Sequence, residues 1–207
     1  MDSAAKQRSI AEWLGTGSIN IFGLPFSGKD TQAIRLAQLF RGQMLSGGDI
    51  LRGSKRTKLV AHISTGNLAP TDEYLEVVLP FLSQEIFAGK PLILSSVGRW
   101  HGEEDGVLKA TAESGHPVRA VIFLNMDQEH IHHRFHDKEA MMHRGDREDD
   151  DLEVLETRLK EFHDKTQPVI NFYRGQDMLI EVDGNLSREE VTTQIINKLY
   201  AFANPAS

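Results

Sequence analysis

The sequence predicts an α/β protein in which helices cover both faces of a parallel sheet. Short apolar runs alternate along the chain with longer segments whose apolar residues recur at helical spacing. Strands that alternate with crossover helices form a parallel sheet with right-handed connections. The 207 residues, of which 40% are hydrophobic and 26% charged, suffice for one sizeable core. We therefore expect a single domain over residues 1–207, with a sheet of about five strands.

Five apolar runs are the predicted strands, and five segments are the predicted helices. The strands are "SINIFG" (18–23), "GQML" (42–45), "PLILSS" (91–96), "VRAVIFLN" (118–125) and "DMLIEVDG" (177–184). The longer helical segments are "KDTQAIRLAQLF" (29–40), "TDEYLEVVLPFLSQEIF" (71–87), "DQEHIHHRF" (127–135) and "DDLEVLETRLKEFHDKTQPVINFY" (150–173). A short amphipathic helix that contains "IAEWL" (10–14) precedes the first strand, and we expect it to serve packing.

Composition excludes several classes of protein. The 23 Lys and Arg against 30 Asp and Glu give a net charge of −7, which disfavours a broad nucleic-acid footprint and requires any anion site to be local. The absence of cysteine excludes disulfides and thiolate zinc sites. No apolar run approaches the ~20 residues of a membrane span. We expect a cytoplasmic monomer that binds neither nucleic acid nor membranes.

The stretch "GLPFSGKDTQ" (23–32) predicts a phosphate-binding loop. Gly23, Gly28 and Lys29 occupy the fixed positions of G-x-x-x-x-G-K-[ST], after a predicted strand and before a predicted helix. In that setting the backbone N–H groups and the helix N-terminus converge on an anion. The last position of the motif holds Asp30 in place of the hydroxyl that binds Mg²⁺ in other loops of this kind.

The chain resembles the adenylate kinase branch of the nucleoside monophosphate (NMP) kinases. Its loop carries the branch's Pro at Pro25 and ends in Thr31-Gln32, and the branch also lacks the hydroxyl at position 30. Further segments follow in family order over residues 18–200: "SGGDILR" (46–52), "STGNLAPTDE" (64–73), "LILSSVGRW" (92–100) for the family's D-G-F-P-R, and "REDDDLEVLETRLKEFHDKTQPVINFY" (147–173).

The resemblance implies a fold and a reaction. The fold is the three-layer P-loop NTPase fold with an N-terminal helical extension (1–17), an NMP-binding helical insertion (46–75) and a short lid (136–149). The reaction is the reversible transfer of the γ-phosphoryl group of ATP to AMP, which gives two ADP and uses Mg²⁺. Phosphoryl transfer needs positive charge around the moving group and exclusion of water, and the ordered set of arginines supplies that charge.

The resemblance also implies the site residues. Those expected to bind ATP are Gly23, Pro25, Phe26, Ser27, Gly28, Lys29, Asp30, Thr31 and Arg134. Those expected to bind the monophosphate are Gly47, Arg52, Leu68, Arg99, Glu103, Arg147 and Arg158. Those expected to act in catalysis are Lys29, Arg99, Arg134, Arg147 and Arg158.

Two departures from the family pattern concern the metal. Ser95 stands where the family's D-G-F-P-R aspartate helps to hold Mg²⁺, and a carboxylate stands instead at Asp30. One hypothesis is a compensating exchange, in which Asp30 takes over the magnesium. The alternative is that Asp30 faces away from phosphate and only favours the positive end of its helix.

A third departure concerns the acceptor base. Glu103 stands four residues beyond Arg99, where the family carries a Gln that reads adenine. An ionised carboxylate only accepts hydrogen bonds and suits the N1–H and N2–H₂ of guanine better. AMP is the favoured acceptor, while GMP, CMP and UMP stay open. A nucleotide-binding pseudokinase also stays open, because the D-G-F-P aspartate and glycine are lost.

A histidine-rich segment is a weaker candidate metal site. His130, His132, His133, His136 and His143 lie close together in the sequence. The chain has no cysteine and no H-E-x-x-H motif, so we expect these side chains to be solvated.

Overall fold

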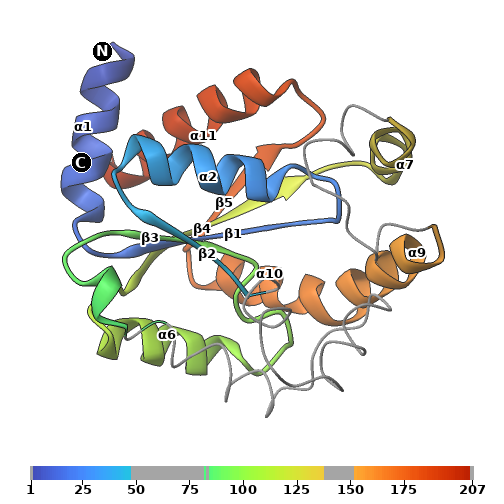
Figure 1. The fold of residues 1–207 in the computed structure, drawn as a ribbon, viewed down its shortest axis with the longest axis horizontal. Coiled ribbons are helices and arrows are strands. Elements are labelled where there is room, and N and C mark those ends of the chain that lie inside the picture. Colours follow the sequence, from blue (N-terminus) through green and yellow to red (C-terminus); the bar gives the residue numbers. More distant parts are fainter. Residues whose placement is uncertain (1, 48–81, 83, 138–151, 206–207) are drawn as a thin grey trace.

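A computed structural model describes residues 2–47, 82, 84–137 and 152–205. Its strands are β1 (Ser18–Gly23), β2 (Gln43–Ser46), β3 (Leu92–Ser95), β4 (Val118–Asn125) and β5 (Leu179–Asp183). They form one parallel sheet in the order β2-β3-β1-β4-β5 (Figure 1). The predicted parallel sheet is confirmed, and each predicted strand lies within two residues of the observed one.

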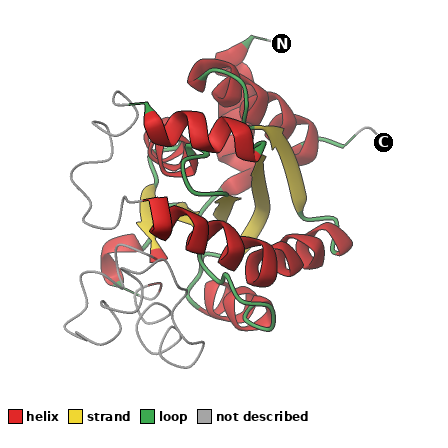
Figure 2. Cartoon of the chain, turned by 90° about the vertical axis from the view of Figure 1, so that its right-hand side faces the viewer, coloured by secondary structure: helices red, strands yellow, loops and turns green. Residues whose placement is uncertain are grey.

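Helices cover both faces of the sheet (Figure 2). They are α1 (Ser3–Leu14), α2 (Lys29–Leu39), α6 (Glu104–Glu113), α7 (Gln128–His136), α9 (Leu152–Glu161), α10 (Gln167–Gly175) and α11 (Arg188–Ala203), with the 3₁₀ turn η1 (Glu85–Phe87) and the π-helical turn η2 (Phe162–Thr166). Helices α1, α2 and α11 lie above the sheet in Figure 1, and α6 and α10 lie below it.

Strand alternation divides the core into two clusters. Successive side chains of a strand point to opposite faces. Ile19 and Ile21 of β1 therefore pack with α1, α2 and α11, whereas Phe22 packs with α7, α9 and α10. In β4, Ile122 joins the first cluster and Phe123 the second. A sheet with apolar side chains on both faces needs two helical layers, which gives the predicted three-layer architecture.

Three helical features differ from the prediction. No helix was predicted for α6 or α11, although α11 begins with a capping box in which the Ser187 hydroxyl accepts from the Glu190 N–H and the Glu190 carboxylate accepts from the Ser187 N–H. The segment 150–173 is interrupted by η2, so that α9 and α10 are separate helices. Pro168 stands at the start of α10, where a residue without an N–H is tolerated.

Helix α1 packs on α11, which brings the two ends of the chain to one side of the molecule (Figure 1). The rings of Trp13 and Phe202 meet edge to face at 6.0 Å, and the Lys6 ammonium donates to the Asn197 side chain at 2.7 Å. In the described part of the chain, no helix combines the length and the apolar character needed to cross a bilayer.

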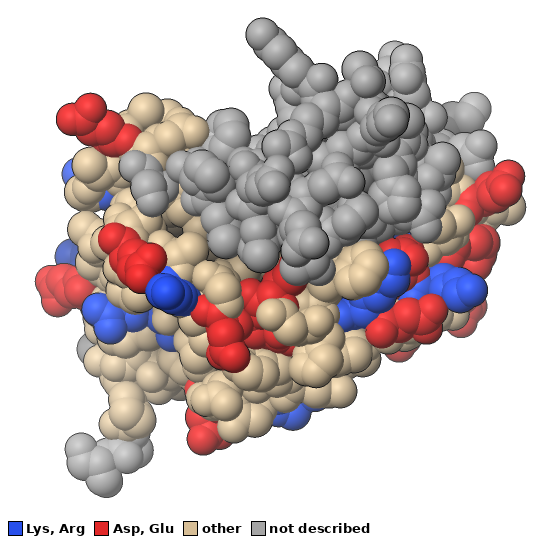
Figure 3. Space-filling model, turned by 90° about the horizontal axis from the view of Figure 1, so that it is seen from below, with Lys and Arg blue, Asp and Glu red and all other residues tan. Residues whose placement is uncertain are grey.

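The face below the sheet carries charges of both signs. Figure 3 shows acidic and basic side chains intermixed over its described part. This face therefore shows no concentration of positive charge over its described part. Open parallel sheets bind ligands at the carboxyl ends of their strands, so we expect the positive charge of the site to lie there.

Candidate functional site

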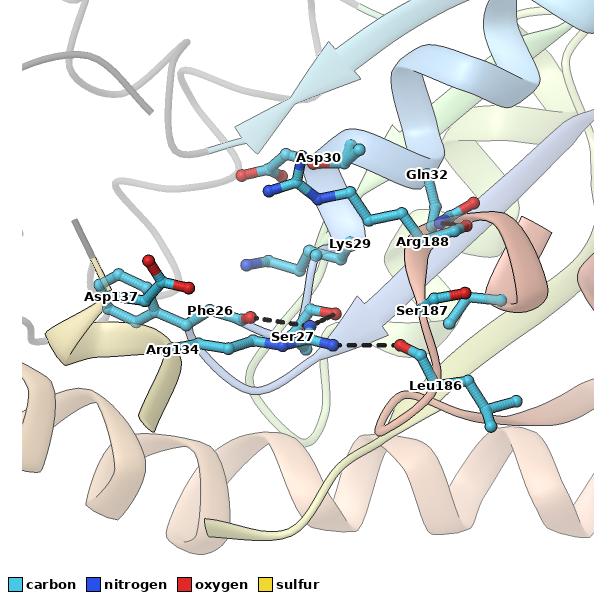
Figure 4. A pocket seen from close by; sticks show the side chains of 13 residues that line it. Phe26, Ser27, Lys29, Asp30, Gln32, Arg134, Asp137, Leu186, Ser187 and Arg188 are labelled. Carbon is cyan, nitrogen blue, oxygen red and sulfur yellow. Dashed lines mark hydrogen bonds between the residues drawn. The ribbon is translucent and has the colours of Figure 1, made fainter. Parts of the chain in front are cut away.

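A cavity of about 240 Å³ lies where β1 passes into α2 (Figure 4). Residues 26–32 form one wall, and residues 186–188 with Val191 form the opposite wall. Arg134 and Asp137, from the end of α7, line a third side. Seven residues of the predicted ATP site thus surround one cavity: Phe26, Ser27, Gly28, Lys29, Asp30, Thr31 and Arg134.

The two motif glycines of the loop are required by its geometry. A Cβ at Gly23 would lie 2.5 Å from the Ser27 Oγ, so the tight turn leaves no room for a side chain. Gly28 adopts φ +88° at the N-cap of α2, a left-handed conformation that favours glycine. The loop therefore leads directly into the helix N-terminus, where backbone N–H groups remain available for an anion.

Phe26 adds bulk to the loop without obstructing its fold. It adopts φ +61°, which is unusual for a residue other than glycine. Its side chain is 7% exposed, and its ring meets Phe135 of α7 edge to face at 5.3 Å. Burial of the aromatic ring offsets the backbone strain and fixes the loop to α7.

Arg134 joins the phosphate-binding loop to the segment between β5 and α11. Its Nη1 donates to the carbonyl oxygens of Phe26 and Ser27 at 3.4 and 3.2 Å, and its Nη2 donates to those of Gly184 and Leu186 at 3.0 and 3.3 Å (Figure 4). Burial, and secondarily the charge of Arg188, lower the pKa of its guanidinium. The resemblance implied a role in ATP binding and catalysis, and the structure places the side chain where it also holds two walls of the cavity together.

Arg188 brings a further positive charge to the cavity. Its side chain extends from the start of α11 towards the side on which Asp30 lies, and Lys29 extends into the same cavity from α2 (Figure 4). The Arg188 carbonyl accepts from Gln32 Nε2 and from Arg35 Nη1, both at 3.0 Å, so the backbone at the start of α11 is fixed to α2. Within the described ranges, the Arg188 guanidinium makes no hydrogen bond or ion pair.

Sequence reasoning missed Arg188, although a signal was present. The spacing of Ser187 and Glu190 is that of a capping box and predicts a helix start after the last strand. Helices that follow parallel strands begin at the carboxyl edge of the sheet, beside the ligand site. A cation in the first turn opposes the helix dipole, and such a violation of local preference often marks a functional residue.

The loop after β3 positions Arg99. The buried Asn20 of β1 donates to the Val97 carbonyl at 2.7 Å and accepts from the Val97 N–H at 3.2 Å. The Thr166 hydroxyl donates to the Arg99 carbonyl at 3.1 Å. Two adjacent strands and η2 thus fix the backbone that carries Arg99. Gly98, with φ +74°, makes the turn between these contacts.

Ser95 and Asp30, the two residues that depart from the family pattern for the metal, are in contact. Ser95, at the end of β3, pairs in register with Ile21 of β1, and β1 leads into the loop. The Ser95 hydroxyl donates to Oδ1 of Asp30 at 2.5 Å. Position 95, where the family carries a carboxylate, and the new carboxylate at position 30 therefore occupy one place in the fold.

Glu103 is buried beside the start of α6. It is 2% exposed, and its Oε2 accepts from the Trp100 N–H at 3.0 Å, which closes the turn between these residues. Glu103, whose carboxylate is predicted to recognise the acceptor base, thus also stabilises the local turn.

The remaining predicted residues are distributed over other elements or lie outside the described residues. Gly47 is buried just beyond β2, and Arg158 lies on α9 with intermediate exposure. Three predicted residues, Arg52, Leu68 and Arg147, lie outside the described ranges, as do most of the segments 46–75 and 136–149.

The histidines of α7 make pairwise contacts. His132 lies 3.5 Å from the Glu156 carboxylate, and His130 lies 3.8 Å from that of Asp127. No trio of His, Asp or Glu with metal-binding geometry occurs among the described residues, and His143 lies outside them.

Comparison with known proteins identifies the family. The model of the family described as adenylate kinase matches residues 21–178. The chain belongs to the adenylate kinase family. It is 34% identical over 181 residues to an adenylate kinase of Parvibaculum lavamentivorans, with 84% of this chain and 88% of that protein covered. It is 30% identical over 190 residues to an adenylate kinase of Thermus thermophilus, with 88% and 97% covered.

Family membership confirms the resemblance and the fold class. The chain is a phosphotransferase of the nucleoside monophosphate kinase type, and its loop cavity belongs to a nucleotide-binding enzyme. Adenylate kinases in general use Mg-ATP.

Replacement of Gly98 by alanine tests the turn that carries Arg99. A Cβ at Gly98 would lie 2.6 Å from Val107 Cγ2, in addition to the cost of φ +74°. We expect Gly98→Ala to destabilise the protein by about 2–3 kcal/mol in urea unfolding, because strain and overlap add. Gly89→Ala is the matched control, since Gly89 has the same φ with nothing within 4 Å of its Cβ. Equal losses in the two variants would show that the Val107 contact is unimportant.

Replacement of Arg188 by glutamine tests its contribution to the nucleotide site. We expect the affinity for a nucleoside triphosphate to fall about tenfold in calorimetric titration, the effect of losing one charge-assisted hydrogen bond. Thermal stability should be unchanged or slightly higher, because a cation at a helix N-terminus is unfavourable. Arg174→Gln, which removes an exposed ion pair between Arg174 of α10 and Glu181 of β5, is the control. Unchanged affinity in Arg188→Gln would contradict the assignment.

Proposed function

We propose that the protein is an adenylate kinase-like nucleoside monophosphate kinase that transfers the γ-phosphoryl group of ATP reversibly to AMP and forms two ADP. The observation that carries this proposal is the cavity in which the loop, Lys29 and the N-terminus of α2 converge. Membership of the adenylate kinase family supports it.

In the proposed reaction the donor lies along the loop cavity. The loop amides and Lys29 hold its β- and γ-phosphates. Bound Mg²⁺ supplies charge that neutralises these phosphates. Arg99, together with Arg52, orients the acceptor phosphate, one oxygen of which attacks the γ-phosphorus while the bond to the β–γ bridging oxygen breaks and ADP leaves.

The other proposed arginines act on the transferring group. Arg134, Arg147 and Arg158 stabilise the charge spread over its equatorial oxygens. Closure of the lid segment 136–149 excludes water, so that ATP is not simply hydrolysed. The NMP-binding insertion 46–75 contributes Leu68 to the acceptor nucleoside.

We also propose an oligomeric state and a cellular location for the protein. Its large exposed hydrophobic side chains in the described part are few and are spread over three elements: Ile34 and Leu39 on α2, Ile86 on η1 and Leu152 on α9. Single exposed apolar residues of this kind are normal on monomers. We therefore propose a monomer, and the cysteine-free sequence suits the cytoplasm.

Two alternatives rest on specific observations. A carboxylate at Glu103 favours GMP over AMP, because guanine presents two adjacent donors, N1–H and N2–H₂, whereas adenine presents an acceptor, N1, beside its N6 donor. The replacement of the D-G-F-P aspartate by Ser95 favours a nucleotide-binding protein with weakened catalysis. Turnover and the choice of acceptor decide among these three functions.

Removal of the Lys29 ammonium tests catalysis by the loop. We expect Lys29→Ala to lower kcat for ADP formation by at least about 10²–10³-fold, as loss of a charge-stabilising donor does. The variant should stay folded, because Lys29 is only half-buried, at the start of α2, and lines the cavity outside the hydrophobic core. Lys109→Ala, on the surface of α6, is the control. If the wild-type protein binds ATP but forms no diphosphate, the pseudokinase alternative is correct.

A panel of acceptors tests the base. AMP, GMP, CMP and UMP are compared in one ATP-coupled assay, and we expect the highest kcat/KM with AMP. The same panel with Glu103→Gln should raise the preference for AMP over GMP about tenfold if the carboxylate faces the base, because an amide can both donate and accept. An unchanged preference, with a loss of stability, would assign Glu103 to the turn at Trp100 alone.

A further inference from the structure

Asp30 and Ser95 belong to neighbouring elements that meet at the carboxyl edge of the sheet. Asp30 lies in the first turn of α2, and Ser95 ends β3, the strand beside β1. Both positions differ from the family pattern, and they are 65 residues apart in the sequence. Their side chains nevertheless form a hydrogen bond of 2.5 Å, and Ser95 is 2% exposed.

The position of Asp30 requires a physical explanation. A carboxylate in a phosphate-binding cavity repels phosphate unless a cation lies between them. Asp30 lines the same cavity as Lys29 and Thr31, immediately after the lysine of the loop. In other loops of this kind the residue at that position holds the magnesium ion. A favourable effect on the helix dipole alone would leave the contact with Ser95 unexplained.

The donor chemistry fits magnesium. Mg²⁺ prefers hard oxygen ligands and is usually bound through one or two carboxylates, substrate phosphates and water, without a complete protein cage. The absence of a group of three metal-binding side chains among the described residues is compatible with such a site. A hydroxyl that donates to one carboxylate oxygen fixes the orientation of that carboxylate, as the outer partners of metal ligands do.

We propose that Asp30, oriented by the Ser95 hydroxyl, forms the magnesium site of this enzyme, with the metal-binding carboxylate moved from the end of β3 to the start of α2. The inference rests on the proposed function, because the ion is the one that accompanies the donor nucleotide. Asp30 faces the metal directly or through water, and Ser95 is a positioning residue.

A double-mutant cycle tests the exchange. The wild-type protein is compared with Asp30→Gly, Ser95→Asp and the double variant Asp30→Gly/Ser95→Asp, which restores the family pattern at both positions. The readout is the ratio of ATP affinities measured by calorimetry in excess Mg²⁺ and in EDTA. Binding of Mn²⁺ to the protein with a non-hydrolysable ATP analogue, followed by electron paramagnetic resonance, gives the metal affinity independently of turnover.

The proposal predicts a specific pattern. Asp30→Gly should lower the metal affinity of the nucleotide complex about 10- to 100-fold, and the double variant should recover it to within about threefold of wild type. Ser95→Ala, which keeps the carboxylate but removes its orienting bond, should cost about tenfold or less. Asp137→Asn removes the other carboxylate among the described residues that line the cavity, and it should leave the ratio of ATP affinities within about twofold of wild type.

Three outcomes would overturn the proposal. They are an unchanged metal affinity in Asp30→Gly, no recovery in the double variant, and an equal loss in Asp137→Asn, which would reflect cavity charge alone. A change in thermal stability without a change in metal affinity would assign Asp30 to the helix. These readouts measure binding and not turnover, so they test the metal site independently of the proposed function. If the protein shows the expected pattern of metal affinities but forms no diphosphate, the metal site is correct and the proposed kinase activity is wrong.

Discussion

The placement of β1 between β3 and β4 in a parallel sheet is the constraint on which the site depends. All strands end at the same edge, so the loop after β1, the turn after β3 and the segment between β5 and α11 all leave the sheet at that edge. Hydrogen bonds between these segments then fix their positions relative to one another. Asn20 fixes the turn after β3 to β1, and Arg134 fixes the loop after β1 to the segment after β5.

Positive charge in the cavity is organised by those same contacts. The cavity gathers Lys29, Arg134 and Arg188 from three helices. Arg134 directs its donors to backbone carbonyls, and its pKa is lowered by burial and by the nearby Arg188. Like charges held this close in a partly buried site favour a polyanionic ligand, which relieves their repulsion when it binds. The net charge of −7 for the whole chain does not oppose this, because the three cations outnumber the two carboxylates, Asp30 and Asp137, among the described residues that line the cavity.

The strands and the loop were predictable because their signals are local. Buried parallel strands are apolar along their length, and the loop motif lies between a strand and a helix start. Helix α11 was also predictable, since Val191, Ile195 and Leu199 recur at helical spacing after a capping box. The carbonyl contacts of Arg134 and the bond between Ser95 and Asp30 were not, because they depend on strand order and on which side chains meet across it. The sequence suggested a relation between Ser95 and Asp30 only through family resemblance.

That last contact changes how the altered loop is interpreted. In the sequence, position 95 lacks the family's carboxylate and position 30 carries an additional one, which look like two separate changes. In the fold, the two positions share one place, which holds one carboxylate and one hydroxyl within hydrogen-bond distance. In the proposed magnesium site, the oxygen donors near the phosphates are therefore rearranged and not removed. Magnesium ligation depends on the kind of oxygen and its position, not on the element that supplies it, so the exchange can preserve the site. No comparable exchange is available to Lys29, because among the described residues that line the cavity the other cations, Arg134 and Arg188, come from α7 and α11 and approach from other walls.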